Sequence, residues 1–320
     1  MLKGKNIFIS GGMGFIGSNL CKRLVKNNKL TIFDNGLRNA LKFTDFKNHK
    51  NIKIIEGDIL DFESVCEAMS DDVDIVVHMA AIAGVSNYYN YPVRTMEVNM
   101  VGTYHMLKAA AEKKLSRFVN FSSSEVYGPH IFRASETTNT VQGDAKVSRW
   151  IYSVSKLTGD HLILAYHRQM NLPVVSVRPF NIYGPGQVGE GAVQIFVNQA
   201  IKNKTITIRG DGTQIRAWCY IDDLINGVLL CMEKKEAIGN IFNIGNPSAA
   251  LNIVQLANKI KKVSKSKSRI IFKKSKFADV ELRIPSIHKA QSLLGYNPKV
   301  SLDEGLKRTI SWCKKVRKLI

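Results

Sequence analysis

Three glycines near the start of the chain restrict its fold more than any other feature. The apolar run at residues 7–9 is followed by Gly11, Gly14 and Gly17, and apolar residues at helical spacing come next. The pattern predicts a strand, a tight turn and a helix. Gly11 permits the turn, Gly14 lets a pyrophosphate approach the backbone, and Gly17 allows close packing of helix on strand. Because the helix start favours anions, we predict a dinucleotide site.

An acidic residue ends the second predicted strand. The apolar run at residues 30–33 leads to Asp34, which is followed by Asn35 and Gly36. An acid about 20 residues after the glycines is placed to bind adenosine ribose hydroxyls, and it would repel the extra phosphate of NADP. The pattern therefore favours NAD. Asp34 could instead act only as a turn residue before Asn35.

Strands and helices alternate up to about residue 175, which predicts an α/β fold with a doubly wound parallel sheet of the Rossmann type. After Arg178 the pattern becomes irregular, so we expect a dinucleotide-binding domain at 1–178. A smaller α/β substrate-binding lobe would occupy 179–320, with some segments returning to the first domain. The predicted strands are 6–10, 29–33, 52–56, 73–78, 117–122 and 173–178. The predicted helices are 15–27, 61–69, 95–114, 152–170, 191–203, 222–234, 252–263 and 302–318.

Composition excludes several classes of protein. The 320 residues are 45% hydrophobic, yet no apolar run reaches the roughly 18 residues that span a bilayer, so no membrane partner is expected. No signal peptide is evident, and the five cysteines are scattered without metal-ligand spacing, which predicts a cytoplasmic protein without a metal site. The net charge is +20, and residues 261–276 hold eight Lys or Arg. We interpret these as solvated surface residues and predict no nucleic-acid partner, since that segment has one aromatic residue.

A candidate base lies on the predicted helix 152–170. Tyr152 and Lys156 stand four residues apart and share one face of that helix. Tyrosine, with a pKa of about 10, is a poor base at neutral pH, but a nearby ammonium and a nicotinamide cation favour the phenolate. Ser123 follows the strand 117–122, where a loop would meet the nicotinamide end of the cofactor. Its hydroxyl can share the proton of a reacting alcohol, so all three residues are predicted to be catalytic.

Further motifs follow in order along the chain. They are Gly57-Asp58-Ile59, His78-Met79-Ala80-Ala81, Glu125-Val126-Tyr127-Gly128, Arg178-Pro179-Phe180-Asn181-Ile182-Tyr183-Gly184-Pro185, and Gly210-Asp211-Gly212 with Arg216. With the glycine turn and the Tyr152/Lys156 pair, they make the chain resemble the extended short-chain dehydrogenase/reductase family. The resemblance is specifically to its NAD-dependent nucleotide-sugar epimerases, dehydratases and decarboxylases, and it runs essentially end to end.

The resemblance implies a shared first step. Tyr152 would remove the proton of the sugar 4-hydroxyl while C4 passes hydride to NAD, and Ser123 would hydrogen-bond the same oxygen. Asn181, Arg216 and Arg283 would hold the diphosphate or sugar of the substrate, as forked donors in the case of the arginines. In relatives the helices at 95–114 and 152–170 form a dimer interface, so a homodimer is expected. The expected cofactor-binding residues are Gly11, Gly14, Phe15, Ile16, Gly17, Asp34, Asn35, Asp58, Ile59, Ala80, Ala81, Asn99, Ser122, Tyr152 and Lys156.

The residues after Ser123 leave the net reaction open. Similar 4,6-dehydratases carry Asp-Glu there, whereas this chain has Ser124 and Glu125, and serine is too weak an acid to replace the aspartate. The Ser-Glu pair resembles that of UDP-glucuronate decarboxylases, but the arginine that those enzymes place after Gly-Pro is replaced here by Gly186-Gln187. Glu125 is either an acid/base at C5 or a hydrogen-bonding loop residue.

An epimerase or dehydratase acting through a 4-keto intermediate is therefore expected, with a decarboxylase as the alternative. A non-catalytic NAD-binding sensor or scaffold is the rival from another class. The intact Tyr152, Lys156 and Ser123 speak against that rival, because a scaffold needs none of the three.

Overall fold

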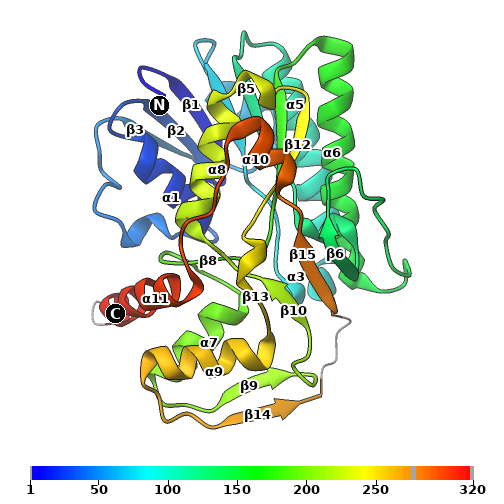
Figure 1. The fold of residues 1–320 in the computed structure, drawn as a ribbon. Coiled ribbons are helices and arrows are strands. Elements are labelled where there is room, and N and C mark those ends of the chain that lie inside the picture. The colour runs from blue at the N-terminus through cyan, green and yellow to red at the C-terminus, as the bar shows by residue number, and fades with distance from the viewer. Residues whose placement is uncertain (1, 275–278, 318–320) are drawn as a thin grey trace.

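The computed structural model describes residues 2–274 and 279–317. Its centre is a seven-stranded sheet in the order β12-β7-β5-β4-β1-β2-β3, with every neighbouring pair parallel (Figure 1). The prediction of a doubly wound parallel sheet is confirmed. The strands are β1 (Asn6–Ser10), β2 (Lys29–Asp34), β3 (Ile52–Glu56), β4 (Ile75–His78), β5 (Arg117–Phe121), β7 (Val174–Pro179) and β12 (Asn240–Ile244).

Alternating side chains give this sheet two separate cores. Ile7 and Ile9 of β1 join one buried cluster, whereas Phe8 joins another together with Phe118 of β5. Successive side chains of a strand point to opposite faces, so a strand buried on both faces is apolar throughout. The continuous apolar runs in the sequence reflect this two-sided burial.

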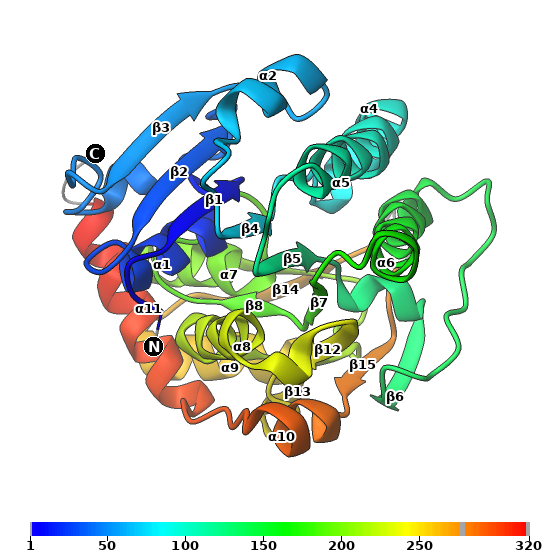
Figure 2. The ribbon, with the colours of Figure 1, turned by 90° about the horizontal axis from the view of Figure 1, so that it is seen from above.

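Helices cover both faces of the sheet (Figure 2). On one face lie α2 (Phe62–Ala68), α4 (Pro92–Met96), α5 (Gly102–Ala111) and α6 (Ile151–Met170). The opposite face is covered by α1 (Phe15–Leu24) and α8 (Ile221–Glu233), whereas α7 (Ala192–Ile201), α9 (Ile253–Ser264) and α11 (Leu302–Arg317) lie in the lower part of the molecule in Figure 1. The remaining α-helices are α3 (Val85–Asn90) and α10 (His288–Leu294). No helix within the described residues is long and apolar enough to cross a membrane.

Smaller sheets form the lower part of the molecule in Figure 1. One has the order β13-β10-β15-β6, and two pairs, β11-β8 and β14-β9, accompany it. Two strands do not follow the expected division of the chain at residue 178. β6 precedes residue 178 but joins a small sheet, and β12 follows it but joins the large sheet. The strands are β6 (His130–Ala134), β8 (Ile182–Tyr183), β9 (Ile206–Arg209), β10 (Ile215–Ala217), β11 (Cys219–Tyr220), β13 (Ala250–Asn252), β14 (Ile270–Lys273) and β15 (Leu282–Pro285).

The predicted strands agree with the structure to within two residues at each end. The predicted helix 95–114 differs, because α4 and α5 are joined there by a π-helical turn at Glu97–Val101. The described residues also form five short 3₁₀ turns: η1 (Leu41–Phe43), η3 (Ser124–Tyr127), η4 (Ser148–Trp150), η5 (Lys235–Ala237) and η6 (Pro247–Ala249). Residue 318, the predicted end of the last helix, lies outside the described residues.

Candidate active site

The glycine turn sits where β1 meets α1. Gly11 has a φ of +74°, and a Cβ there would lie 2.6 Å from the backbone nitrogen of Ala80. A Cβ on Gly17 would lie 2.5 Å from the carbonyl oxygen of Gly11. Both positions therefore require glycine. Gly14 caps α1 and has more room, since its Cβ would approach only the Gly11 oxygen, at 3.3 Å.

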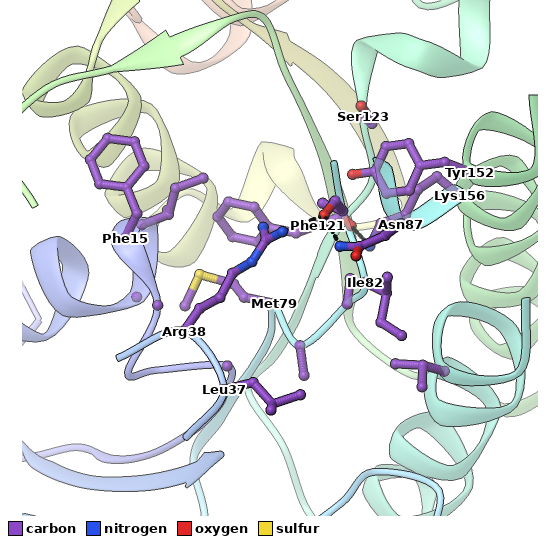
Figure 3. A pocket seen from close by; sticks show the side chains of 18 of the residues that line it. Phe15, Leu37, Arg38, Met79, Ile82, Asn87, Phe121, Ser123, Tyr152 and Lys156 are labelled. Atoms are coloured by element: carbon purple, nitrogen blue, oxygen red, sulfur yellow. Dashed lines mark hydrogen bonds between the residues drawn. The ribbon is translucent and has the colours of Figure 1, made fainter. Parts of the chain in front are cut away.

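A cavity of about 720 Å³ opens above this turn (Figure 3). It runs from the start of α1 and the end of β2 to the end of β5 and the first turns of α6. Its walls include the predicted cofactor residues Gly11, Gly14, Phe15, Ile16, Gly17, Asp34, Asn35, Asp58, Ile59, Ala80, Ala81, Ser122, Tyr152 and Lys156. The glycine turn, the free N-terminus of α1 and an acid at the end of β2 fit the pyrophosphate and ribose of a dinucleotide.

Asp34 both lines this cavity and holds the turns around it. Its carboxylate accepts hydrogen bonds from the backbone N–H groups of Met13 and Gly36, each at 2.9 Å. Burial raises the pKa of Asp34, and the two backbone hydrogen bonds oppose that shift. The turn role considered from the sequence is therefore present, and the ribose-binding role stays a prediction.

Three other predicted cofactor residues have protein partners. Asn99 exchanges hydrogen bonds with the backbone of Ile82, so it supports the cavity wall without lining it. The Ser122 hydroxyl donates to Asp160 at 2.8 Å. Asp58 lines the cavity and forms an ion pair with Arg94.

Ser123, Tyr152 and Lys156 come together at the far end of the cavity (Figure 3). Ser123 precedes η3, and the other two residues lie on α6. The Ser123 hydroxyl accepts a hydrogen bond from the Glu125 backbone N–H at 3.2 Å, and its proximity to the Tyr152 phenol lowers the pKa of that phenol. The Tyr88 ring stacks on Tyr152, with ring centroids 5.0 Å apart and planes inclined by 12°.

A nearby ammonium was expected to lower the pKa of the Tyr152 phenol, but in the structure this pKa is raised. Burial raises its pKa to about 12, with Ser123 acting in the opposite direction. The Lys156 ammonium donates to the Phe121 carbonyl oxygen at 2.7 Å, and burial lowers the pKa of Lys156 to about 8. In this structure the predicted ammonium is therefore directed at a backbone oxygen rather than at the phenol.

Glu125 is held by two buried arginines. Its carboxylate is 2.7 Å from Arg149 Nη2 and also forms an ion pair with Arg283. Burial alone would raise the pKa of Glu125, but the two guanidiniums lower it to about 2. Arg149 has two nitrogens, Nε and Nη1, without a hydrogen-bond partner among the described residues.

Arg149 was not among the residues predicted from the sequence. It lies in η4, three positions before Tyr152, a spacing that puts two residues on one side of a helical turn. Its guanidinium carbon is 5.8 Å from the centroid of the Tyr88 ring. A cation three residues before the candidate base was the only local signal.

The three predicted substrate residues occupy different environments. Asn181 lines the cavity and donates to the Ala217 carbonyl oxygen at 3.2 Å. Arg283 is 2% exposed and contacts Glu125 and the Gly128 carbonyl oxygen. Arg216 is bound to Asp279 and the Val280 carbonyl oxygen. Neither arginine is among the residues that line the cavity, and their substrate roles stay predictions.

Comparison with known proteins defines the class. Residues 7–245 match the model of the NAD dependent epimerase/dehydratase family. The chain is 34% identical to a UDP-N-acetyl-alpha-D-glucosaminuronate decarboxylase of Bacillus cytotoxicus, over 98% of both chains. It is 33% identical to UDP-glucuronic acid decarboxylase 1 of Xenopus tropicalis, over 97% of this chain and 72% of that protein.

Solved structures point the same way. A Bacillus cereus UDP-glucuronic acid 4-epimerase in complex with UDP-glucuronic acid and NAD superimposes with a TM-score of 0.88 and 32% identity. The match covers 97% of this chain and 99% of that one. The chain belongs to the NAD dependent epimerase/dehydratase family. It is an NAD-dependent enzyme of the group that holds nucleotide-sugar epimerases, dehydratases and decarboxylases, which confirms the predicted family, cofactor and general activity.

Proposed function

We propose that the substrate is a nucleotide-diphosphate sugar bearing a carboxylate, and that the enzyme removes this carboxylate through a 4-keto intermediate. The observation that carries the proposal is the Glu125 carboxylate between Arg149 and Arg283, beside Tyr152. Two guanidiniums against one carboxylate leave a net positive charge beside the cavity wall that Glu125 forms, which would favour an anionic sugar. Arg149 does not line the cavity, so its charge would act on the sugar carboxylate from behind Glu125, in place of the cation that is absent after Gly-Pro.

Each catalytic residue has a definite task in this scheme. Tyr152 accepts the proton of the 4-hydroxyl, and Ser123 hydrogen-bonds the same oxygen. NAD, when bound, supplies the hydride acceptor and returns the hydride at the end. Lys156 stays fixed at the cavity wall by its hydrogen bond to the Phe121 carbonyl oxygen.

The 4-ketone makes the sugar carboxylate part of a β-keto acid. The C5–C6 bond can then break, with C6 leaving as carbon dioxide and the electron pair entering an enolate between C4 and C5. The enolate takes up a proton from water at C5, which restores the C4 ketone before the hydride returns. The hydroxyls of Tyr152 and Ser123 are placed to stabilise the enolate oxygen, since donors aimed at developing charge lower the barrier.

Dehydration fits the site less well. A base at C5 should have a pKa near the working pH, whereas the pKa of Glu125 is about 2. The position of the expected acid is taken by Ser124, a buried serine. Epimerisation at C4 is the second candidate, because it needs only Tyr152, Lys156 and Ser123, and it is favoured by the likeness to a UDP-glucuronic acid 4-epimerase.

Product analysis tests these alternatives. The enzyme with NAD would be incubated with UDP-glucuronate and, in parallel, with the neutral UDP-glucose. Loss of 44 mass units from the uronate alone supports decarboxylation, and an unchanged mass with a new C4 configuration by NMR supports epimerisation. Turnover of UDP-glucose at an equal or higher rate would contradict a carboxylate-bearing substrate.

Variants of the site sharpen this test. Tyr152→Phe should abolish turnover and leave NAD binding nearly intact, and Tyr166→Phe on the same helix is the matched control. Arg149→Gln should raise KM for the uronate about tenfold, as expected when a buried positive charge near the sugar carboxylate is lost.

We also propose a cytoplasmic homodimer without nucleic-acid partners. The free cysteines support a reducing compartment. Exposed apolar residues on and beside the α4–α5 region, namely Tyr91, Val93, Val101 and Tyr104, support a subunit interface there. The division into a cofactor domain and a substrate lobe near residue 178 belongs to the same proposal.

A further inference from the structure

A buried polar network lies directly behind the catalytic loop. At its centre, Asp160 of α6 is paired with Arg178 of β7, with Nε to Oδ2 at 2.9 Å. Asp160 also accepts hydrogen bonds from Ser122 at 2.8 Å and from Ser176 at 2.6 Å. Asp160 is 2% exposed and Arg178 is 4% exposed, so the contacts are shielded from solvent.

The network continues on the other side of the loop. Arg178 Nη1 donates to the Tyr127 hydroxyl at 2.8 Å, and this hydroxyl donates to Asn243 Oδ1 at 2.8 Å. The Arg178 guanidinium carbon also lies 4.9 Å from the centroid of the Tyr127 ring. Asn243 belongs to β12 and donates in turn to the Ala134 carbonyl oxygen.

Ser122 and Tyr127 connect this network to the catalytic loop, and they lie at opposite ends of that loop. Ser122 immediately precedes Ser123, and Tyr127 ends the η3 turn that carries Ser124 and Glu125. The loop that bears these candidate catalytic groups is therefore tied at both ends to a single ion pair. One partner of that pair, Asp160, is on the same helix as Tyr152 and Lys156.

We propose that the Asp160–Arg178 pair, acting through Ser122 and Tyr127, is the positioning device that fixes Ser123 and Glu125 relative to Tyr152. These residues do not contact the reacting atoms in this scheme. They set the geometry between the end of β5 and the start of α6. The kinetic consequence rests on the proposed reaction at Tyr152, whereas the effect on loop order does not.

The sharpest test replaces a hydroxyl and leaves the packing alone. Tyr127→Phe removes the link between Arg178 and Asn243 and retains the ring. Tyr296→Phe is the matched control, because Tyr296 is equally buried and its hydroxyl donates to the Gly245 carbonyl oxygen outside the network. Asp160→Asn, which removes the charge and keeps the shape, is a second variant that tests the connection through Ser122.

Two measurements separate positioning from general destabilisation. Tyr127→Phe should lower kcat about tenfold or more, since small misplacements of reacting groups are costly, with the NAD dissociation constant and substrate KM within about twofold. Tyr296→Phe should leave kcat within about twofold of the wild type. Amide hydrogen exchange at residues 123–128 should accelerate in Tyr127→Phe and not in the control.

The outcomes are distinguishable from failure of the proposed function. If the wild-type enzyme turns over no uronate, the proposed function fails, and the exchange measurement still decides the positioning role. Wild-type exchange at 123–128 in Tyr127→Phe would overturn the inference. So would equal losses of kcat in Tyr127→Phe and Tyr296→Phe.

Discussion

Glu125 illustrates how neighbouring charge can outweigh burial at a single residue. Its side chain is 18% exposed, and burial by itself would favour the protonated form. Arg149 and Arg283 reverse this preference and hold the carboxylate ionised. The same two contacts make Glu125 a poor base and a strong structural anchor.

The stabilising ion pairs of Glu125 with Arg149 and Arg283 should be lost at acidic pH. The pKa of Glu125 lies at about 2 instead of 4.5, so its contribution to stability is complete above about pH 4.5 and disappears as the pH falls through about 2. The full difference corresponds to about 3 kcal/mol. Urea unfolding of the wild type and of Glu125→Gln between pH 5 and pH 2.5 should therefore converge as the pH falls. Glu63→Gln, at an exposed site on α2, should stay parallel to the wild type, and parallel curves for Glu125→Gln would contradict the ion-pair interpretation.

On the scale of elements, α6 is the part of the fold that organises the site. Tyr152, Lys156 and Asp160 succeed one another at intervals of four residues and share one face of the helix. Burial lowers the pKa of Lys156 to about 8, and Asp160 opposes this shift. The helix therefore carries both Lys156 and Asp160, and the carboxylate of Asp160 favours the charged form of Lys156.

The pH dependence of kcat/KM above neutrality should reflect the titration of Lys156. In the free enzyme kcat/KM should rise with pH up to about 8 and then level off, because the gain in Tyr152 phenolate is offset there by the loss of the Lys156 ammonium. Lys156→Arg keeps its charge, so any activity that remains should continue to rise at higher pH. Lys146→Arg, at an exposed position, should show the wild-type profile. A flat wild-type profile from pH 7 to 9.5 would refute the assignment.

Local patterns in the sequence predicted the elements well because the central strands β1 and β4 of the large sheet are mostly apolar and the glycine turn is tightly constrained. They missed the π-helical turn at Glu97–Val101, which carries no distinctive residues. The Glu125–Arg283 pair joins residues 158 positions apart, and the Tyr127–Asn243 contact joins residues 116 apart. Hydrophobic periodicity reflects only residues that are close together in the sequence, so the partners of the site residues could not be predicted.

On the scale of the whole molecule, the α4–α6 side of the sheet is the candidate subunit interface. Val101 and Tyr104 are 41% and 43% exposed there. Val101→Glu combined with Tyr104→Glu should convert the proposed dimer to a monomer in sedimentation velocity, because charges at an apolar interface are costly. Phe272→Glu, at a 55% exposed phenylalanine of β14, should leave the dimer intact. A wild-type monomer would contradict the proposal directly.

The return of β12 to the edge of the large sheet also affects how the chain is made. Some sixty residues separate β7 from β12, the strand that pairs with it, and they contain four of the eight strands of the smaller sheets. During synthesis the growing sheet therefore keeps an open edge at β7 until residue 244 has left the ribosome. Chaperones would be needed most in that interval, and nascent chains stalled before residue 240 should be the most prone to aggregate.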